Sequence, residues 1–241
     1  MATETATPHR VAIYAAPDPQ SDWWLRGSEW LGRCAAQRLE LPQPCIDGLS
    51  IAQFAQLTAD PRRYGWHATL KAPFRLAPGE DMASLRGGLA KIAGDHRAFA
   101  LDRLEVARLD GFLALCPRHA PTALDALAND CVRRLQLLAA ALDETELARR
   151  RRKPLTPEED ALMLAWGYPW VLHRFKFHFS LTGPIHGLAE EKVTQLQHAA
   201  TEYFETLPPL IVDRLSLFVE PYPGADFECV EQLALKSWRS D

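Results

Sequence analysis

RYGWHATLKAPF, at residues 63–74, recurs 111 residues later as RFKFHFSLTGPI, at residues 174–185. The two stretches share one pattern: Arg, an aromatic residue, any residue, an aromatic residue, His, any residue, a hydroxyl residue, Leu, any residue, a small residue, Pro and an apolar residue. The offset places His178 at the position of His67. A pattern of this length, found twice, indicates an internal duplication.

Both stretches alternate between apolar and polar residues, which predicts β-strands. Successive strand side chains point to opposite faces, so each histidine shares a face with the hydroxyl residue two positions on. Trp66 is expected on the apolar face, toward the core. Pro73 and Pro184 should end the pairing, because proline cannot donate to a ladder. The expected polar faces are His67, Thr69 and Lys71 in the first strand, and Lys176, His178, Ser180 and Thr182 in the second.

A histidine on a single half-buried strand is more often structural than functional. Here the same His-x-hydroxyl-Leu pattern occupies matching places in a repeat. That coincidence favours a functional interpretation, in which the two polar faces form the halves of one site.

The paired His-x-Thr/Ser-Leu strands resemble the signature of the two-histidine (2H) phosphoesterase superfamily, which includes cyclic nucleotide phosphodiesterases and RNA 2′,3′-cyclic phosphodiesterases. The wider wording, WHATLKAPF with HFSLTGP, resembles the bacterial branch often encoded beside phosphonate-degradation genes. A single His-x-Thr is a weak motif, whereas the pair with its matched prolines is specific. The resemblance covers nearly the whole chain and implies a bilobal fold around a central cleft.

The order strand, helix, motif strand, helix, strand occurs twice, in repeat one at about 10–110 and in repeat two at about 111–236. We therefore predict an α+β fold in one domain over residues 1–241, a duplicated 2H-phosphoesterase-like fold whose two lobes are related by a pseudo-twofold axis. The motif strands should face one another. Outside the motifs, the expected strands are at 10–16, 99–108, 112–116, 210–219 and 227–236, and the expected helices at 21–39, 50–56, 81–94, 122–142 and 189–207, with a short one after Thr156.

Composition limits the function classes. The 241 residues are 47% hydrophobic and 24% charged, as in an ordinary globular protein, and the net charge of −4 disfavours bulk nucleic-acid binding. Five cysteines without Cys-x-x-Cys spacing provide no zinc or redox motif, and their odd number fits a reducing compartment. Residues 1–9 lack the apolar run of a signal peptide, and no stretch is long enough to span a membrane. A cytoplasmic location is expected.

Hydrolysis of a cyclic phosphodiester needs a base for the attacking water, an acid for the departing sugar oxygen and donors for the phosphoryl oxygens. Two imidazoles can supply base and acid near neutral pH if one begins neutral and the other protonated. The hydroxyls can donate to phosphoryl oxygens, and the lysines can offset charge. No metal or cofactor is expected. The predicted catalytic residues are His67, Thr69, His178 and Ser180, and the predicted substrate-binding residues are Lys71, Lys176, Thr182 and Tyr14.

The resemblance implies that His178 is the base and His67 the acid, although the pseudo-symmetry leaves the reverse open. It also suggests a small ribosyl cyclic phosphate as substrate, such as 5-phosphoribosyl 1,2-cyclic phosphate. The alternatives are an RNA-end 2′,3′-cyclic phosphodiesterase or 2′-5′ ligase, and a non-catalytic module that binds a nucleotide or phosphosugar. The cationic run of residues 149–153 is either a solvated loop or a lid near the cleft. Oligomeric state stays open.

Overall fold

The computed structural model describes residues 7–238, so the stretch 1–9 on which the signal-peptide expectation depends lies mostly outside the described part. The predicted α+β class is confirmed. The strands are β1 (Arg10–Ala15), β2 (Arg33–Cys34), β3 (Leu39–Glu40), β4 (Ala68–Phe74), β5 (Phe99–Ala100), β6 (Leu104–Leu109), β7 (Phe112–Pro117), β8 (Phe179–Ser180), β9 (Ile211–Val212), β10 (Arg214–Glu220) and β11 (Glu228–Ala234). The helices are α1 (Asp22–Leu31), α2 (Ile51–Leu57), α3 (Ala59–Tyr64), α4 (Met82–Asp95), α5 (Thr122–Leu135), η1 (Gln136–Leu138), α6 (Glu144–Arg150), α7 (Pro157–Trp166), η2 (Leu172–Arg174) and α8 (Glu190–Phe204).

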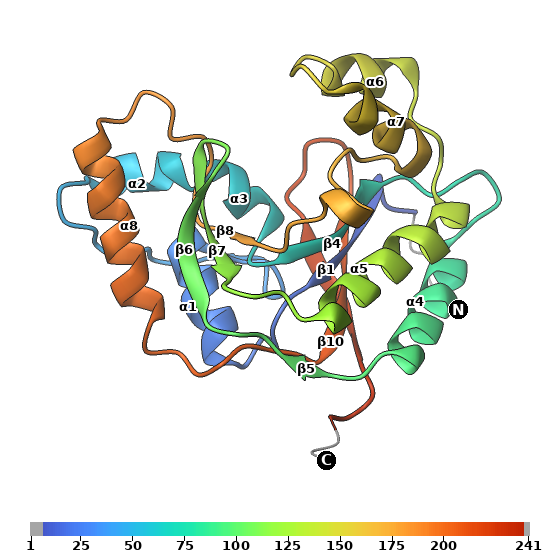
Figure 1. Ribbon diagram of the computed structural model, residues 1–241, viewed down its shortest axis with the longest axis horizontal. Helices are drawn as coiled ribbons and strands as arrows, with labels where there is room; N and C mark the ends of the chain where they lie inside the picture. Colours follow the sequence, from blue (N-terminus) through green and yellow to red (C-terminus); the bar gives the residue numbers. More distant parts are fainter. Residues whose placement is uncertain (1–6, 239–241) are drawn as a thin grey trace.

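A seven-stranded sheet in the order β11-β10-β1-β4-β8-β7-β6 forms the centre, and its neighbouring strands are antiparallel (Figure 1). Apart from the edge strand β11, this order is symmetric. Exchanging β1 with β7, β4 with β8 and β6 with β10 reproduces it from the other end. The short strands β5 and β9 also occupy equivalent places, and they pair with each other. The strand order is therefore that of two repeats related by a pseudo-twofold axis between β4 and β8.

The two halves of the sheet exchange strands. β10, late in the chain, joins β1 and β4, while β6, from the first half of the chain, joins β7 and β8. The β6–β7 hairpin turns at Asp110 and Gly111, both of which have positive φ. We propose this turn as the boundary between the repeats.

The expected facing of the motif strands takes the form of direct pairing. β4 and β8 are hydrogen-bonded neighbours in the middle of the sheet, with Ala68 opposite Phe179. Trp66 is fully buried and stacks on Phe179 and Phe204, which confirms its expected place in the core. The two motifs therefore meet at the centre of the molecule.

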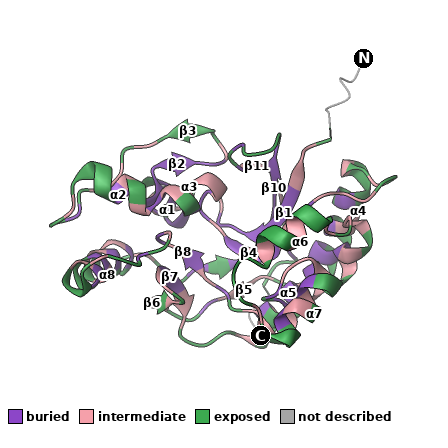
Figure 2. Ribbon diagram, turned by 90° about the horizontal axis from the view of Figure 1, so that it is seen from above, coloured by how far each residue is buried: buried purple, intermediate pink, exposed green. Residues whose placement is uncertain are grey.

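Helices cover the sheet in two pairs. Helices α4 and α5 pack on each other and on the β11-β10-β1-β4 half, whereas α1 and α8 lie at the β8-β7-β6 half (Figure 1). Trp23 and Trp30 of α1 contact Phe204 of α8. Each pair combines one helix from each repeat. Buried residues accordingly follow the central strands, while β3 is exposed (Figure 2).

Several expected elements are shorter in the structure. The helix predicted at 21–39 ends at Leu31, because Gly32 adopts φ 82° and closes the last turn. The helix predicted at 122–142 ends at Leu135 and continues as a single 3₁₀ turn. The second motif strand is restricted to Phe179–Ser180, because η2 precedes it.

Residues 143–174, here called the cap, contain α6, α7 and η2 and lie beside the end of β4 (Figure 1). Arg75 at that end bonds Glu146 of the cap at 2.8 Å, and Arg174 bonds Glu159 at 2.6 Å. Within the described residues, no helix combines the length and apolar character needed to cross a membrane.

Candidate active site

The register of β4 and β8 brings the four predicted catalytic residues together. Because Ala68 lies opposite Phe179, the antiparallel order places His67 across from Ser180 and Thr69 across from His178. Directly opposite side chains have Cβ atoms roughly 4.5–5.5 Å apart and diagonal ones roughly 7–8 Å apart, which is the relation between the two histidines. All four are partly exposed, whereas Ala68 and Phe179 are buried on the other face.

Both imidazoles have the same tautomer. Nδ1 of His67 lies 2.8 Å from the carbonyl oxygen of Gly65, and Nδ1 of His178 lies 2.8 Å from that of Lys176. A carbonyl only accepts, so each Nδ1 must carry the proton and each Nε2 has a free lone pair in the neutral ring. No residue of the described chain forms a hydrogen bond with either Nε2. The site therefore presents two equivalent imidazole nitrogens that can exchange protons with a ligand.

His67 is held by aromatic residues. Tyr14 stacks on its ring at a centroid distance of 3.7 Å, and Tyr64 lies 6.2 Å away. Burial lowers the pKa of His67 from 6.5 to about 4, although the bond to Gly65 raises it, and nearby His178 lowers it further. Tyr14 itself is completely buried. It therefore positions His67 and does not have the solvent-facing place expected of a substrate-binding residue.

His178 has a more open and more cationic setting. Phe112 lies 5.5 Å from its ring. Burial lowers the pKa of His178, the bond to the Lys176 carbonyl raises it, and the Lys176 ammonium lowers it. Lys176 is exposed. Its predicted role near the phosphate thus agrees with its position beside His178.

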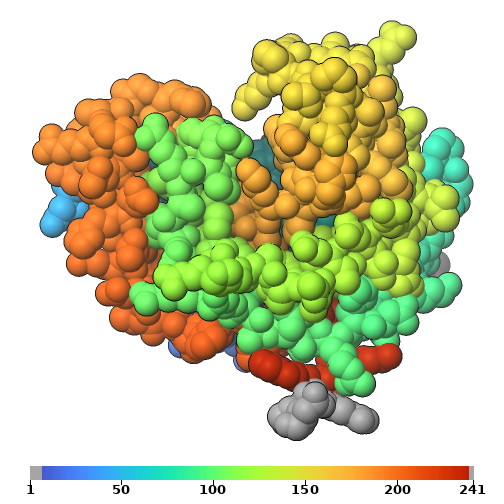
Figure 3. All heavy atoms as spheres, viewed as in Figure 1, coloured from blue at the N-terminus to red at the C-terminus, as the bar shows by residue number. Residues whose placement is uncertain are grey.

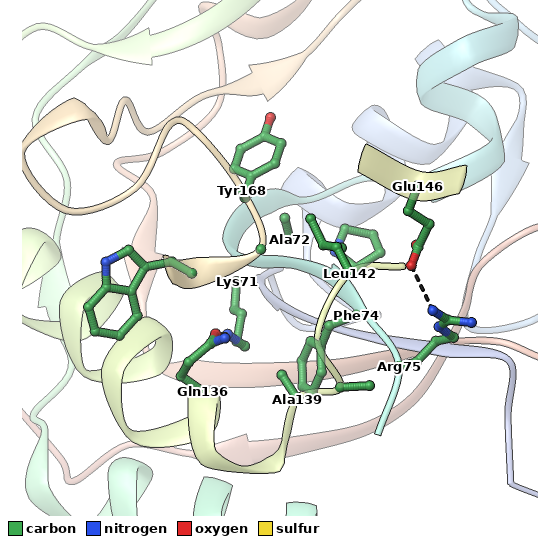
Figure 4. Close-up of a pocket in the computed structure, with 13 residues that line it drawn as sticks. Lys71, Ala72, Phe74, Arg75, Gln136, Ala139, Leu142, Glu146 and Tyr168 are labelled. Atoms are coloured by element: carbon green, nitrogen blue, oxygen red, sulfur yellow. Dashed lines mark hydrogen bonds and ion pairs between the residues drawn. The ribbon is translucent and has the colours of Figure 1, made fainter. Parts of the chain in front are cut away.

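Lys71 is not on the face expected from the sequence. Tyr14 pairs with Thr69 and Ile13 pairs with Lys71, so Leu70 is the extra residue of a β-bulge. The bulge turns Lys71 to the side of Ile13, a core residue. The side chain is 3% exposed, and its Nζ donates to Gln136 at 2.9 Å (Figure 4). Burial lowers its pKa to about 8. The expected contact of Lys71 with substrate in the cleft is therefore contradicted.

Thr182, the counterpart of Lys71, is also displaced by an irregularity. The N–H groups of Leu181 and Thr182 both donate to the Leu113 carbonyl, at 2.8 and 3.2 Å. The Thr182 hydroxyl accepts from the Leu113 N–H at 3.0 Å and donates to the Gly183 carbonyl at 2.8 Å, and the residue is 2% exposed. Its hydrogen-bonding capacity is used within the sheet, so the predicted substrate contact is not supported.

The sequence analysis did not identify a cluster beside His67. Glu220 is completely buried and binds both Arg10 and Arg63. Arg63 and its repeat counterpart Arg174 each pair with a glutamate, Glu220 and Glu159 respectively. The conserved spacing of the two arginines in the repeat was the available signal. Their partners are distant in sequence and could not be inferred from it.

The histidine face lies in a hollow between the cap and the other half of the molecule. In Figure 3, a groove separates the α6–α7 region from the green and orange segments, and atoms of the teal part of the chain are visible within it. In residues 7–238, no group of three or more His, Cys, Asp or Glu is arranged to hold a metal ion. The arrangement suits proton transfer to and from a small anion bound between two imidazoles.

Comparisons with known proteins give a family and a set of relatives. The model of a family described as "Protein of unknown function (DUF1045)" matches residues 69–228. Relatives include proteins named ribose 1,5-bisphosphate phosphokinase PhnN from Janthinobacterium sp. (strain Marseille), 38% identical over 221 residues, and from Laribacter hongkongensis (strain HLHK9), 38% identical over 218 residues. These matches cover 90% of this chain but 49% and 50% of the relatives. The chain therefore spans about half the length of the curated relatives it matches.

Similar solved structures include E. coli LigT complexed with phosphate, with a TM-score of 0.44, 13% identity, and coverage of 96% of this chain and 99% of LigT. A crystal structure of a phosphoesterase has a TM-score of 0.43 and 14% identity, covering 95% of this chain and 99% of that one. The phosphoesterase class recognised from the paired motifs is thus also the class named in these comparisons.

Proposed function

The chain belongs to the DUF1045 family, and from that premise and the geometry of the site we propose that it is a metal-independent phosphodiesterase that opens a small ribosyl cyclic phosphate. The observation that carries the proposal is the pair of imidazoles on adjoining central strands, each with Nδ1 bound to a backbone carbonyl and Nε2 free. A binding module needs no second proton-transferring group. A hydrolase needs both a base and an acid.

The reaction balances with these groups alone. His178 removes a proton from water, the water oxygen attacks phosphorus, and the bond to one ring oxygen of the cyclic phosphate breaks. His67 protonates the departing oxygen, which becomes a sugar hydroxyl. The hydroxyls of Thr69 and Ser180 donate to the non-bridging oxygens, and Lys176 offsets their charge. The opposite positions of the two imidazoles suit in-line displacement, although the pseudo-symmetry also permits His67 as base.

The names of the relatives support a phosphoribosyl substrate. Water opening the 2-oxygen bond of 5-phosphoribosyl 1,2-cyclic phosphate leaves phosphates on carbons 1 and 5, which is ribose 1,5-bisphosphate. That compound appears in the name of the relatives, which are about twice as long as this chain. The present sequence contains no Gly-x-x-x-x-Gly-Lys-Ser/Thr loop for binding a nucleotide triphosphate. We therefore assign to this chain a hydrolysis that supplies the compound and not its phosphorylation.

Substitution of the histidines tests the proposal. His67→Ala and His178→Ala should each lower kcat on a ribosyl 1,2-cyclic phosphate by roughly 10²–10⁴. The double variant should lose less than the product of both losses, because groups that act together are non-additive. His198→Ala, an exposed residue of α8, is the matched control and should retain wild-type activity. Turnover should also survive EDTA.

The outcomes separate the alternatives. Near-wild-type turnover in both single variants would show that the imidazoles are not the acid and base. Loss of activity in EDTA, restored by a divalent metal, would replace the proposed scheme by metal-assisted hydrolysis. Preference for an RNA 2′,3′-cyclic phosphate end over a small ribosyl cyclic phosphate would support the RNA-end alternative. Ligand binding without turnover of any cyclic phosphate would support a non-catalytic module.

A further inference from the structure

Arg150, at the end of α6, has a polar atom that the described protein does not satisfy. Its Nε is buried and has no hydrogen-bond partner within residues 7–238. The adjacent Arg151, by contrast, forms two bonds to Asp160, at 2.7 and 2.8 Å. A buried guanidinium nitrogen without an acceptor is costly unless a ligand supplies one. The cationic run of residues 149–153 is therefore not uniformly a solvated loop.

Arg150 lies toward the His67 half of the site. Its charge acts on Tyr168 and Arg10, and Tyr168 in turn is coupled to Tyr64, which lies 6.2 Å from His67. Viewed from above, α6 overlies β1 and β4 (Figure 2). The Tyr168 hydroxyl is directed away from Lys71 and Gln136 (Figure 4). The cap thus places a guanidinium and a phenol near the first imidazole.

The neighbouring arginines are already neutralised. Arg10 and Arg63 share the buried carboxylate of Glu220. Glu146, the acidic residue nearest to Arg150 in its helix, bonds Arg75 at 2.8 Å. Burial also lowers the pKa of the Arg150 guanidinium, a sign that its charge is only partly compensated. Among the described residues around His67, Arg150 is therefore the arginine that has no carboxylate of its own to bind.

We propose that Arg150, assisted by the Tyr168 hydroxyl, binds a second phosphate of the substrate, a phosphomonoester separate from the cyclic phosphate held between the histidines. This inference rests on the proposed function and narrows its substrate class to ribosyl cyclic phosphates that carry a terminal phosphate. A guanidinium donates two parallel bonds to a phosphate, which suits a dianionic monoester. The compound named for the relatives carries two phosphates, in agreement with such a subsite.

The experiment compares Arg150→Gln with wild type on two probes, ribose 1,2-cyclic phosphate with and without a 5-phosphate. One charged bidentate contact corresponds to a loss of roughly 10- to 100-fold. We expect that loss in kcat/KM for the 5-phosphorylated probe, mainly through KM, and a change below about twofold for the other probe. Arg151→Gln is the matched control, because its partner is Asp160. It should leave both probes unaffected.

Equal losses on both probes, or no loss on either, would overturn the subsite. If Arg150→Gln does not fold, Tyr168→Phe removes only the hydroxyl and should show the same selectivity for the 5-phosphorylated probe at smaller amplitude. Direct titration with ribose 5-phosphate separates this inference from the proposed function. Wild-type binding that is lost in Arg150→Gln supports the subsite even if no cyclic phosphate is hydrolysed, and unchanged binding refutes it.

Discussion

His67 and His178 are both disposed to be neutral in the free protein, because burial lowers the pKa of each and brings that of His67 to about 4. Acid catalysis needs one imidazolium. A bound phosphate anion favours the protonated ring and raises its pKa. The proton required for the leaving oxygen is therefore best retained once substrate has bound.

This leads to a prediction for the pH profiles. In the free enzyme, the protonated fraction of an imidazole falls about tenfold for each pH unit above its pKa. We expect kcat/KM to decline with rising pH above about 6.5, with an acidic optimum, and kcat at saturation to peak at higher pH. The probe should lack a phosphomonoester, whose second pKa near 6 would add its own limb. A kcat/KM that is constant from pH 6 to 8 would contradict imidazolium acid catalysis in the free enzyme.

At the scale of the element, the irregularities in β4 and β8 decide which side chains reach the ligand. In both strands the residue after the motif leucine turns away from the histidine face. Lys71 and Thr182 are consequently structural residues, although both follow the pattern that places a residue in the cleft.

Two substitutions test that assignment. Lys71→Met should leave KM within about twofold, because the ammonium contacts Gln136 and not the ligand. Thr182→Val should leave the buried Leu113 N–H without its acceptor and lower the free energy of unfolding by about 1–3 kcal/mol. Urea unfolding and steady-state kinetics measure the two effects. A rise in KM without loss of stability in Thr182→Val would restore the substrate contact expected from the sequence.

Helix α1 approaches the motif through a glycine. A Cβ added to Gly27 would lie 2.0 Å from Cδ2 of Trp66, whereas one added to Gly87 in α4 would meet nothing within 4 Å. Trp66 directly precedes His67, so the helix helps to place the imidazole.

We expect Gly27→Ala to destabilise the protein by about 1–3 kcal/mol through overpacking and to lower kcat by displacing Trp66. Gly87→Ala should be neutral or stabilise by up to about 1 kcal/mol, since alanine favours a helix. Chemical denaturation and kinetics of this pair provide the comparison. Equal behaviour of the two variants would show that close packing of α1 on Trp66 is not required.

At the scale of the whole molecule, the exchange of β6 and β10 binds the two repeats into one structure. Each half-sheet lacks its third strand unless both repeats are present. Residues 10–110 alone would expose the edge of β1 that β10 covers. Folding of one repeat therefore depends on the other.

The consequence is a single unfolding transition. Far-ultraviolet circular dichroism and tryptophan fluorescence should coincide along a urea titration. Separate fragments divided at the Asp110–Gly111 turn should remain unfolded singly and regain structure when mixed. Two resolved transitions, or a folded fragment, would show that the repeats are independent domains and that the exchanged strands contribute little.

The amino-acid sequence by itself determined the duplication, the α+β class and the pair of histidines with their hydroxyl residues. These features follow from local periodicity and from one pattern repeated at a fixed offset, and both are encoded by neighbouring residues. For the same reason the burial of Trp66 was predictable from alternation alone.

Only the tertiary structure decided the rest of the site. The register of β4 against β8 sets His67 beside Ser180, and the bulge at Leu70 turns Lys71 to the core, because strand pairing depends on partners far away in the chain. The ion pairs of Glu220 and the unpartnered nitrogen of Arg150 likewise arise from segments brought together by folding. A period of two predicts where a regular strand points its side chains, but it cannot reveal where an inserted residue interrupts that period.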